Sequence, residues 1–503
     1  MSPIQLARLH TFTRVLTLAA MLLTVAANIG CGGAITGSHQ PNGDPLHLGA
    51  TPGPLGSTDP QVMELRLGSE PSDRIVSLSL TLNSLKTTNS GDEDIDLLTA
   101  PVTIEFTHSA IVTEPVVVRT IYQDTYSTLK VPDMTGQVVF YDSNGLLTTQ
   151  SLSVSAQSIT LSPAFVLGTD PAVMSVSLDL AQTFTVGMNS VTVNPVVVTA
   201  SSTVPAPVVA PAIGQPETGN VSFLVGTVTA VDTTNHIISL QPSAGDSLQL
   251  AYDNSGGTEF VNCDPAMLTG TMIEVESQTE ADGSVLASQV SLIGAGPSDS
   301  ELYGLLGGYA PDGINYNLIV EGGAGANVTT GLLGKNVTLD WLAASYGVNT
   351  SHLGLDLMAN DDLVFDETHA FPGQFVQVDE DSLLVPDPDS GNAGFMQPRM
   401  FELEEQTISG QVSGYVYDGG TQTGSFTLVV ASDSMIKTMN SGLLGITVRQ
   451  LPQTYLRNSP TFGDGDSVKV RGLLFAGSQY SNVNYQPPSS SVAFIMVADR
   501  ISK

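Results

Sequence analysis

Apolar and polar residues alternate with a period of two along much of this chain, and this pattern constrains the fold most. Leu78, Leu80 and Leu82 alternate with serine and threonine, which places the leucines on one face of a half-buried strand. The same alternation returns over residues 102–106 and 176–180. No long stretch repeats apolar residues with a helical period. We therefore predict an all-β protein.

The chain of 503 residues is long enough for several domains, because a domain typically has about 100 to 150 residues. Turn signals such as Ser-Gly-Asp at 90–92 separate the first strands, and four prolines follow between residues 201 and 219. The predicted organisation is a signal peptide (1–30), a flexible lipid tether (31–60), an antiparallel β-sandwich (61–200), a Pro-rich linker (201–219) and three small β-barrels (220–298, 299–406 and 407–503).

The three barrels are predicted from a repeat with two landmark glycines in each copy. The first glycine lies inside a predicted strand, at Gly226, Gly304 and Gly410. The second begins the spacing Gly-x-x-apolar-x-apolar, at Gly270, Gly373 and Gly465. The residues between the paired apolar positions are Glu274, Gln377 and Lys469. A turn glycine that leads into a strand with alternate inward residues explains this spacing.

Both kinds of domain resemble known families. The strand at 75–85, the acidic turn into Asp96, the strand at 126–131 and the strand at 176–180 resemble a domain of unknown function in bacterial lipoproteins. That resemblance implies a sandwich similar to transthyretin-like and carboxypeptidase-regulatory domains. The three copies resemble a small barrel domain of unknown function, OB-like in shape, that is often repeated in exported proteins. Neither resemblance supplies catalytic residues.

The N-terminus predicts export. Arg8 and Arg14 precede an apolar run over residues 15–27, which is too short for a transmembrane span and is typical of a signal peptide. Residues 27–31, ending at Cys31, resemble the lipobox of bacterial lipoproteins, which implies that the Cys31 thiol receives diacylglycerol.

Asn28 departs from the lipobox pattern, so ordinary cleavage after Ala27 remains the alternative. By the same resemblance, Gly32 favours sorting to the outer membrane or the cell surface. The membrane is then a partner through the lipid anchor.

The charge balance excludes some partners. The chain has 49 acidic and 16 basic residues, and no Lys or Arg lies between Lys130 and Lys335. Such a surface repels the phosphates of nucleic acid, so no nucleic-acid partner is expected. If Cys31 is acylated, Cys263 has no disulfide partner and is expected to be a small buried apolar side chain.

No catalytic motif is evident. The histidines are scattered, and the nucleophile-elbow, phosphate-loop and dinucleotide spacings are absent from the sequence. We therefore expect no enzymatic activity and no cofactor other than calcium. Acidic loops are candidates for calcium because its ligands are hard oxygens, although their spacing fails the EF-hand pattern. The candidates are Asp92, Asp94, Asp96, Asp387 and Asp389.

These observations favour a non-enzymatic, lipid-anchored protein of the cell envelope or cell surface. It would bind or scaffold an envelope protein or a glycan through its array of β-domains. Two alternatives stay open. One is a secreted hydrolase that acts on glycans with acidic residues of the second repeat, and the other is a calcium-stabilised adhesin.

Overall fold

The computed structural model describes residues 59–503 with internal gaps. The gaps are 71, 73, 108–112, 144–145, 170–171, 195–197, 204–219, 243–244, 262, 280–284, 294–299, 310–314, 326–331, 341–343, 350–352, 354–361, 381–383, 387–390, 432–433, 441, 458–460 and 478–493. The predicted signal peptide, lipid-accepting Cys31, nearly all of the tether, most of the linker, Asp387 and Asp389 therefore lie outside the described residues.

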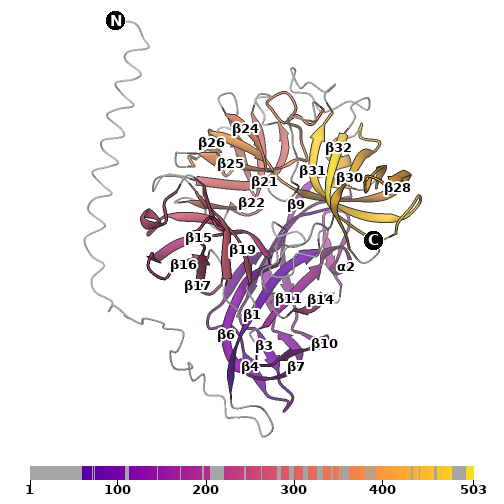
Figure 1. Ribbon diagram of the computed structural model, residues 1–503. Helices are drawn as coiled ribbons and strands as arrows, with labels where there is room; N and C mark the ends of the chain where they lie inside the picture. The colour runs from indigo at the N-terminus through magenta and orange to yellow at the C-terminus, as the bar shows by residue number, and fades with distance from the viewer. Residues whose placement is uncertain are drawn as a thin grey trace, which may run out of the picture. The chain divides into compact units, whose positions relative to one another are not determined.

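The first part of the described chain is a β-sandwich of several sheets around one core (Figure 1). One sheet has the order β14 (Val198–Thr203), β11 (Ala172–Asp179), β1 (Pro60–Glu70), β6 (Thr113–Tyr122). A second has the order β10 (Gln157–Leu167), β7 (Asp124–Val131), β3 (Lys86–Thr88), β4 (Asp94–Asp96). A third has the order β5 (Val102–Glu105), β2 (Ile75–Leu82), β8 (Met134–Tyr141), β9 (Leu147–Val154). The short elements are α2 (Leu180–Thr183), β12 (Phe184–Val186) and β13 (Val191–Val193).

The predicted alternation is confirmed in this sandwich. Leu78, Leu80 and Leu82 of β2 are at most 3% exposed and belong to the core. The antiparallel prediction is wrong for one pair of strands, because β1 and β11 run parallel, with Leu67 opposite Val176. Alternation shows which side chains share a face, but it carries no information on strand direction.

The sheets that follow carry the repeated glycines, and two of them have small-barrel topology. The first repeat contains β15 (Asn220–Asp232), β16 (Ile237–Pro242), β17 (Leu248–Tyr252), β18 (Glu259–Val261), η1 (Pro265–Met267), β19 (Met272–Thr279) and β20 (Val285–Leu292). Its parallel β17–β20 pairing closes five strands in the order β17-β16-β15-β19-β20. A three-strand meander closed by a parallel pair is the OB-like arrangement.

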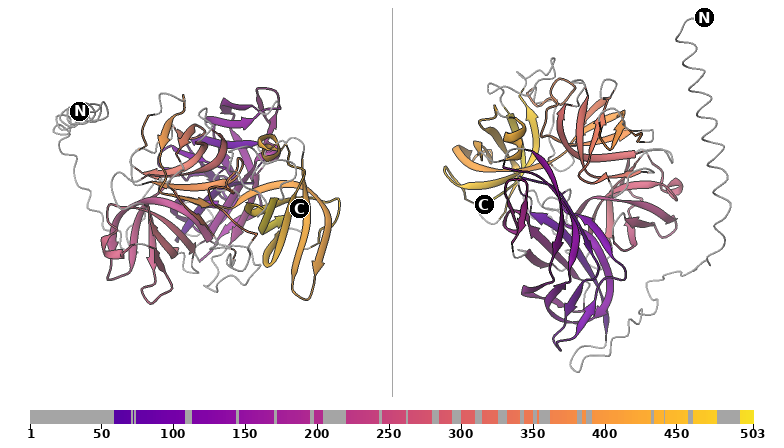
Figure 2. Two further views of the ribbon diagram at one scale, coloured as in Figure 1. Left: turned by 90° about the horizontal axis from the view of Figure 1, so that it is seen from above. Right: turned by 180° about the vertical axis from the view of Figure 1, so that it is seen from behind.

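The third repeat follows the same plan, whereas the described strands of the second repeat form one sheet of seven that no described pairing closes, so the prediction of three barrels is met by two. The second contains β21 (Ser300–Tyr309), β22 (Tyr316–Gly325), β23 (Asn336–Leu339), β24 (Ser345–Val348), β25 (Phe375–Glu380), β26 (Gly394–Met396) and β27 (Met400–Leu403). The third contains β28 (Gln406–Asp418), β29 (Thr423–Val430), α3 (Met435–Met439), β30 (Ile446–Arg457), β31 (Ser467–Ala476) and β32 (Phe494–Ser502). The third barrel is closed, and both views of Figure 2 show its orange and yellow strands curving around one another.

The glycines occupy equivalent positions in all three repeats. The first glycine of each copy faces the first apolar residue of the motif across the strand pair, as Gly226–Ile273, Gly304–Val376 and Gly410–Val468. The second glycine always has a positive φ, of 84° at Gly270, 99° at Gly373 and 89° at Gly465. Its N–H donates to a carbonyl two residues beyond the first glycine at 2.8 Å in every copy. The left-handed backbone therefore explains why this turn needs glycine.

Polar contacts join the domains of the described chain. Arg119 of the sandwich binds Asp246 of the first barrel through two guanidinium nitrogens. Thr107 of the sandwich donates to Glu321 of the second barrel at 3.2 Å. Gln374 donates from the second barrel to the carbonyl of Leu474 in the third at 3.0 Å.

In the part of the chain that the structure describes, no helix is long and apolar enough to cross a membrane.

Candidate functional site: a groove between the sandwich and the third barrel

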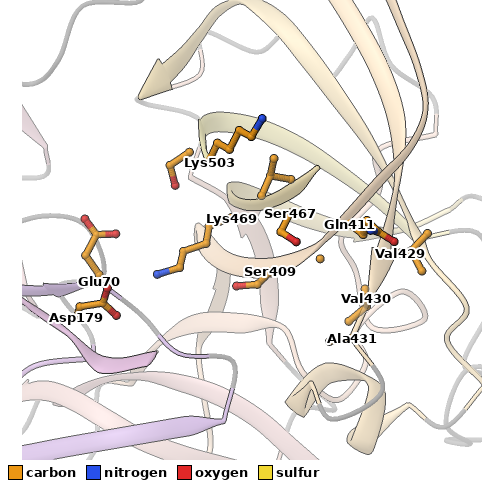
Figure 3. Close-up of a pocket in the computed structure, with 13 residues that line it drawn as sticks. Glu70, Asp179, Ser409, Gln411, Val429, Val430, Ala431, Ser467, Lys469 and Lys503 are labelled. Carbon is orange, nitrogen blue, oxygen red and sulfur yellow. The ribbon is translucent and has the colours of Figure 1, made fainter. Parts of the chain in front are cut away.

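A groove of about 750 Å³ lies between one end of the sandwich and the outer face of the third barrel (Figure 3). Glu70 and Asp179 form the sandwich wall. The polar residues of the barrel wall are Ser409, Gln411, Ser467, Lys469, Ser502 and Lys503. Gly410, Val429, Val430, Ala431 and Val468 complete the lining, and of the three valines only Val429 has an exposed side chain. The groove therefore offers charges of both signs, hydroxyl groups and a small apolar surface.

The parallel pairing of β1 and β11 forms the sandwich wall. Glu70 ends β1 and lies opposite Asp179 in the strand register, so both carboxylates leave the sandwich at the same edge. Asp179 also caps α2, because its side chain accepts a hydrogen bond from the backbone N–H of Gln182 at 3.0 Å. Such a cap fixes the orientation of the Asp179 carboxylate and stabilises the turn that follows.

The barrel wall is the outward face of β28 and β31. Val468 and Val470 point into the core of the third barrel, so the alternating residues Ser467 and Lys469 point outward. On β28, Ser409 lies directly opposite Lys469 in the strand register. The barrel thus presents Lys469 on a rigid sheet rather than on a loop.

Opposite charges face each other across the groove. Figure 3 shows the ammonium group of Lys469 pointing toward the wall that carries Glu70 and Asp179. Lys503 lies at the rim and binds Asp466 at 2.8 Å, and this hydrogen bond lowers the pKa of the Asp466 carboxyl. Only six lysines occur in the chain, and two of them line this groove. This concentration of positive charge is unusual on so acidic a protein.

Lys469 occupies the position between the paired apolar residues of the repeat motif. The equivalent residues of the other copies, Glu274 and Gln377, interact with each other where the first and second repeats meet. This outward position thus makes a contact between domains in two copies and lines the groove in the third. The sequence revealed the position, but it did not identify the groove or its other wall.

Two of the three predicted calcium ligands of the first acidic turn are bound by lysines. Lys130 binds Asp94 at 2.6 Å, and Lys86 binds Asp96 at 3.1 Å. The hydrogen bond from Lys130 also lowers the pKa of the Asp94 carboxyl. Asp92 lies at the turn with a φ of 61°. Within the described ranges, no group of three His, Cys, Asp or Glu side chains is arranged to hold a metal ion.

Acidic residues of the second repeat are likewise bound by separate cationic or basic side chains. Asp379 is paired with Arg399, and Asp362 with Arg449. Asp366 accepts a hydrogen bond from Nδ1 of His369 at 2.7 Å within one turn. The structure does not bring these three carboxylates together as one site.

Cys263 is half-buried beside the core of the first barrel. Its thiol donates to the carbonyl of Val290 at 3.4 Å, and burial raises its pKa. This environment opposes thiolate formation and hence reactivity.

Comparison with known proteins gave no match: no family model matches the chain, and no curated protein matches it. The geometry of the groove therefore carries the functional argument.

Proposed function

We propose that this chain is a non-enzymatic binding protein of the bacterial cell envelope, which uses the groove to hold a segment of a partner protein. The observation that supports this proposal is the opposition of Lys469 to Glu70 and Asp179 across the groove. A ligand that carries both signs of charge can satisfy both walls at once. Binding sites commonly combine an apolar lining with a few placed polar groups in this way.

A polypeptide segment fits these walls better than a neutral glycan. Its acidic and basic side chains can pair with Lys469 and with the two carboxylates, while its amide groups can reach Ser409 and Gln411. Electrostatic complementarity of this kind contributes mainly to specificity and to the rate of association. The acidic surface elsewhere disfavours nucleic acid as the partner.

The proposal includes export and a lipid anchor at Cys31. The apolar run of residues 15–27 and the lipobox-like residues 27–31 support it. Intact-mass measurement and membrane fractionation test this part, with Cys31→Ala as the matched variant. A diacylated wild type in the membrane fraction and a soluble variant are expected. A soluble wild type that begins at Asn28 would contradict the anchor.

Site-specific photocrosslinking in a diderm host tests the groove. A photoreactive residue at the exposed position Ser467 is expected to capture one defined protein. The same residue at Ser425 is the control, since Ser425 is exposed on β29 of the same barrel and does not line the groove.

Charge reversal makes this test specific. Lys469→Glu is expected to abolish capture at Ser467, because it places a third negative charge against Glu70 and Asp179. Lys335→Glu makes the same chemical change on the second repeat and is expected to leave capture intact. Equal capture from Ser467 and Ser425, or capture that is insensitive to Lys469→Glu, would refute the groove as the binding site.

A further inference from the structure

The turn at the second glycine of each repeat directs one side chain differently in two of the copies. In the first repeat, the N–H of Thr271 donates to the carbonyl of Leu268 at 2.9 Å. In the second repeat, the N–H of Gln374 donates to the carbonyl of Phe371 at 3.4 Å. Leu268 and Phe371 each precede the glycine of their copy by two residues. They therefore occupy equivalent positions of the same turn.

These two side chains enter different cores. Leu268 is 1% exposed and belongs to the core of its own barrel. Phe371 is fully buried, but it belongs to the core of the third barrel. Among the described residues of that core, Phe371 is the one that lies outside the third repeat. Its ring meets the ring of Phe494 on β32 edge to face, with the ring centres 4.7 Å apart. The second repeat thus contributes a large apolar side chain to the third barrel.

A buried amide joins this turn to the third barrel. Gln374 is fully buried, and its Oε1 accepts a hydrogen bond from the N–H of Phe371 at 2.8 Å. Its Nε2 donates to the carbonyl of Leu474 on β31 at 3.0 Å. One side chain therefore bonds to the backbone of both repeats. Movement of one repeat past the other would leave a buried polar atom without its partner, which is costly.

Further hydrogen bonds hold the turn from both sides. Asn440 is fully buried at the end of α3, and its Nδ2 donates to the carbonyl of Pro372 at 2.6 Å. The hydroxyl of Tyr316 on β22 donates to the carbonyl of Ala370 at 2.8 Å. The backbone on either side of Phe371 is therefore fixed, and the ring cannot leave the third barrel unless these bonds break.

The exchange of side chains between the repeats is reciprocal. Successive side chains of a strand point to opposite faces. On β31 and β32, one set of side chains belongs to the core of the third barrel, and the alternate set belongs to the core of the second repeat. The alternate set is Leu473, Phe475, Ile495 and Val497, each at most 7% exposed. By contrast, the buried residues that the structure describes in the main core of the first repeat all belong to that repeat.

We propose that the second and third repeats form one interlocked unit, in which neither repeat opens or unfolds without the other. The insertion of Phe371 into the third barrel and the reciprocal side chains of β31 and β32 carry this inference. Each core is close-packed only while the other repeat supplies its part, so the two repeats open cooperatively. The inference goes beyond the binding proposal, because it does not depend on the groove or on its ligand.

Hydrogen–deuterium exchange in increasing urea tests the interlock without any change to its residues. The sample is the mature chain with Cys31→Ala, and mass spectrometry follows peptides from each repeat. We expect the amides of the second and third repeats to lose protection in one shared transition. Loss of protection in two separate transitions would overturn the proposal.

A pair of variants at the equivalent turn positions tests the role of Phe371. Phe371→Ala should raise the exchange rate of β29 and β30 in the third repeat by about tenfold or more, because it leaves a cavity in that core. Leu268→Ala is the matched control, since it should raise exchange in the first repeat and leave β29 and β30 unchanged. Wild-type exchange of β29 and β30 in Phe371→Ala would refute the insertion as a source of coupling.

Two other variants keep the proposal falsifiable if Phe371→Ala does not fold. Phe371→Leu retains most of the apolar volume and should give the same pattern with a smaller increase. Val497→Ala truncates a side chain of the third repeat and should raise exchange in the strands of the second repeat, because it removes part of their core. Exchange of the second repeat that stays at the wild-type rate in Val497→Ala would contradict the reciprocal contact.

Discussion

Replacement of Gly304 by alanine should destabilise the second barrel far more than the same change at Gly308. Both glycines belong to β21. A Cβ at Gly304 would lie 2.0 Å from the carbonyl oxygen of Ile319 on β22, whereas a Cβ at Gly308 would meet nothing within 4 Å. The pair therefore isolates the close approach of two strands from the general effect of removing a glycine.

The magnitude follows from this contact. An ordinary Cβ contact is no shorter than 3.4 Å, so the strands must separate by more than an ångström. Overpacking of this kind costs about 1–3 kcal/mol, and each β21–β22 hydrogen bond lost adds about 1 kcal/mol. We expect Gly304→Ala to lower the free energy of unfolding by roughly 3 kcal/mol. Gly308→Ala should raise it by up to about 1 kcal/mol, because alanine restricts the unfolded chain.

Urea denaturation followed by tryptophan fluorescence measures this difference. The one tryptophan, Trp341, belongs to the second repeat by sequence, so its emission reports on that barrel. The linear dependence of the unfolding free energy on urea gives the two values. Equal midpoints for Gly304→Ala and Gly308→Ala would refute the argument that the strand contact requires glycine.

Two further predictions concern the sandwich and the first barrel. Asp246→Ala should destabilise their contact by about 1–3 kcal/mol, because it removes both hydrogen bonds from Arg119. A double-mutant cycle with Arg119→Ala should show that the two changes are not additive, and additive losses would count against the pair. Cys263 should react with iodoacetamide at least tenfold more slowly at neutral pH than a free cysteine, because burial raises its pKa. Mass spectrometry measures the rate of this alkylation. A rate equal to that of free cysteine would contradict the buried position of Cys263.

The sequence was most informative where one strand or one turn decides the structure. The leucines of β2 could be assigned to the core because alternation is a local property of a strand. The glycines of the three repeats could be aligned because a left-handed turn and a close strand contact both require glycine. These features identified the all-β class and the repeated barrel.

The groove could not be predicted, because it depends on how domains dock. Glu70 and Lys469 are about 400 residues apart in the sequence, and no local pattern relates them. Glu274 and Gln377 were recognised as equivalent outward positions, but their contact with each other requires the first barrel to pack against the second. The parallel pairing that places Glu70 beside Asp179 was missed for a related reason, since alternation does not encode strand direction.

Peptide binding measures the central claim most directly. A library of random peptides is selected on the purified mature chain, and the affinity of the selected peptides is then measured for wild type, Lys469→Glu and Lys335→Glu. We expect the selected peptides to contain both acidic and basic residues. Their affinity for the Lys469→Glu variant should be at least tenfold lower than for the wild type, and their affinity for the Lys335→Glu variant should be unchanged. Peptides of one charge sign, or equal affinities for all three proteins, would contradict the groove as the binding site.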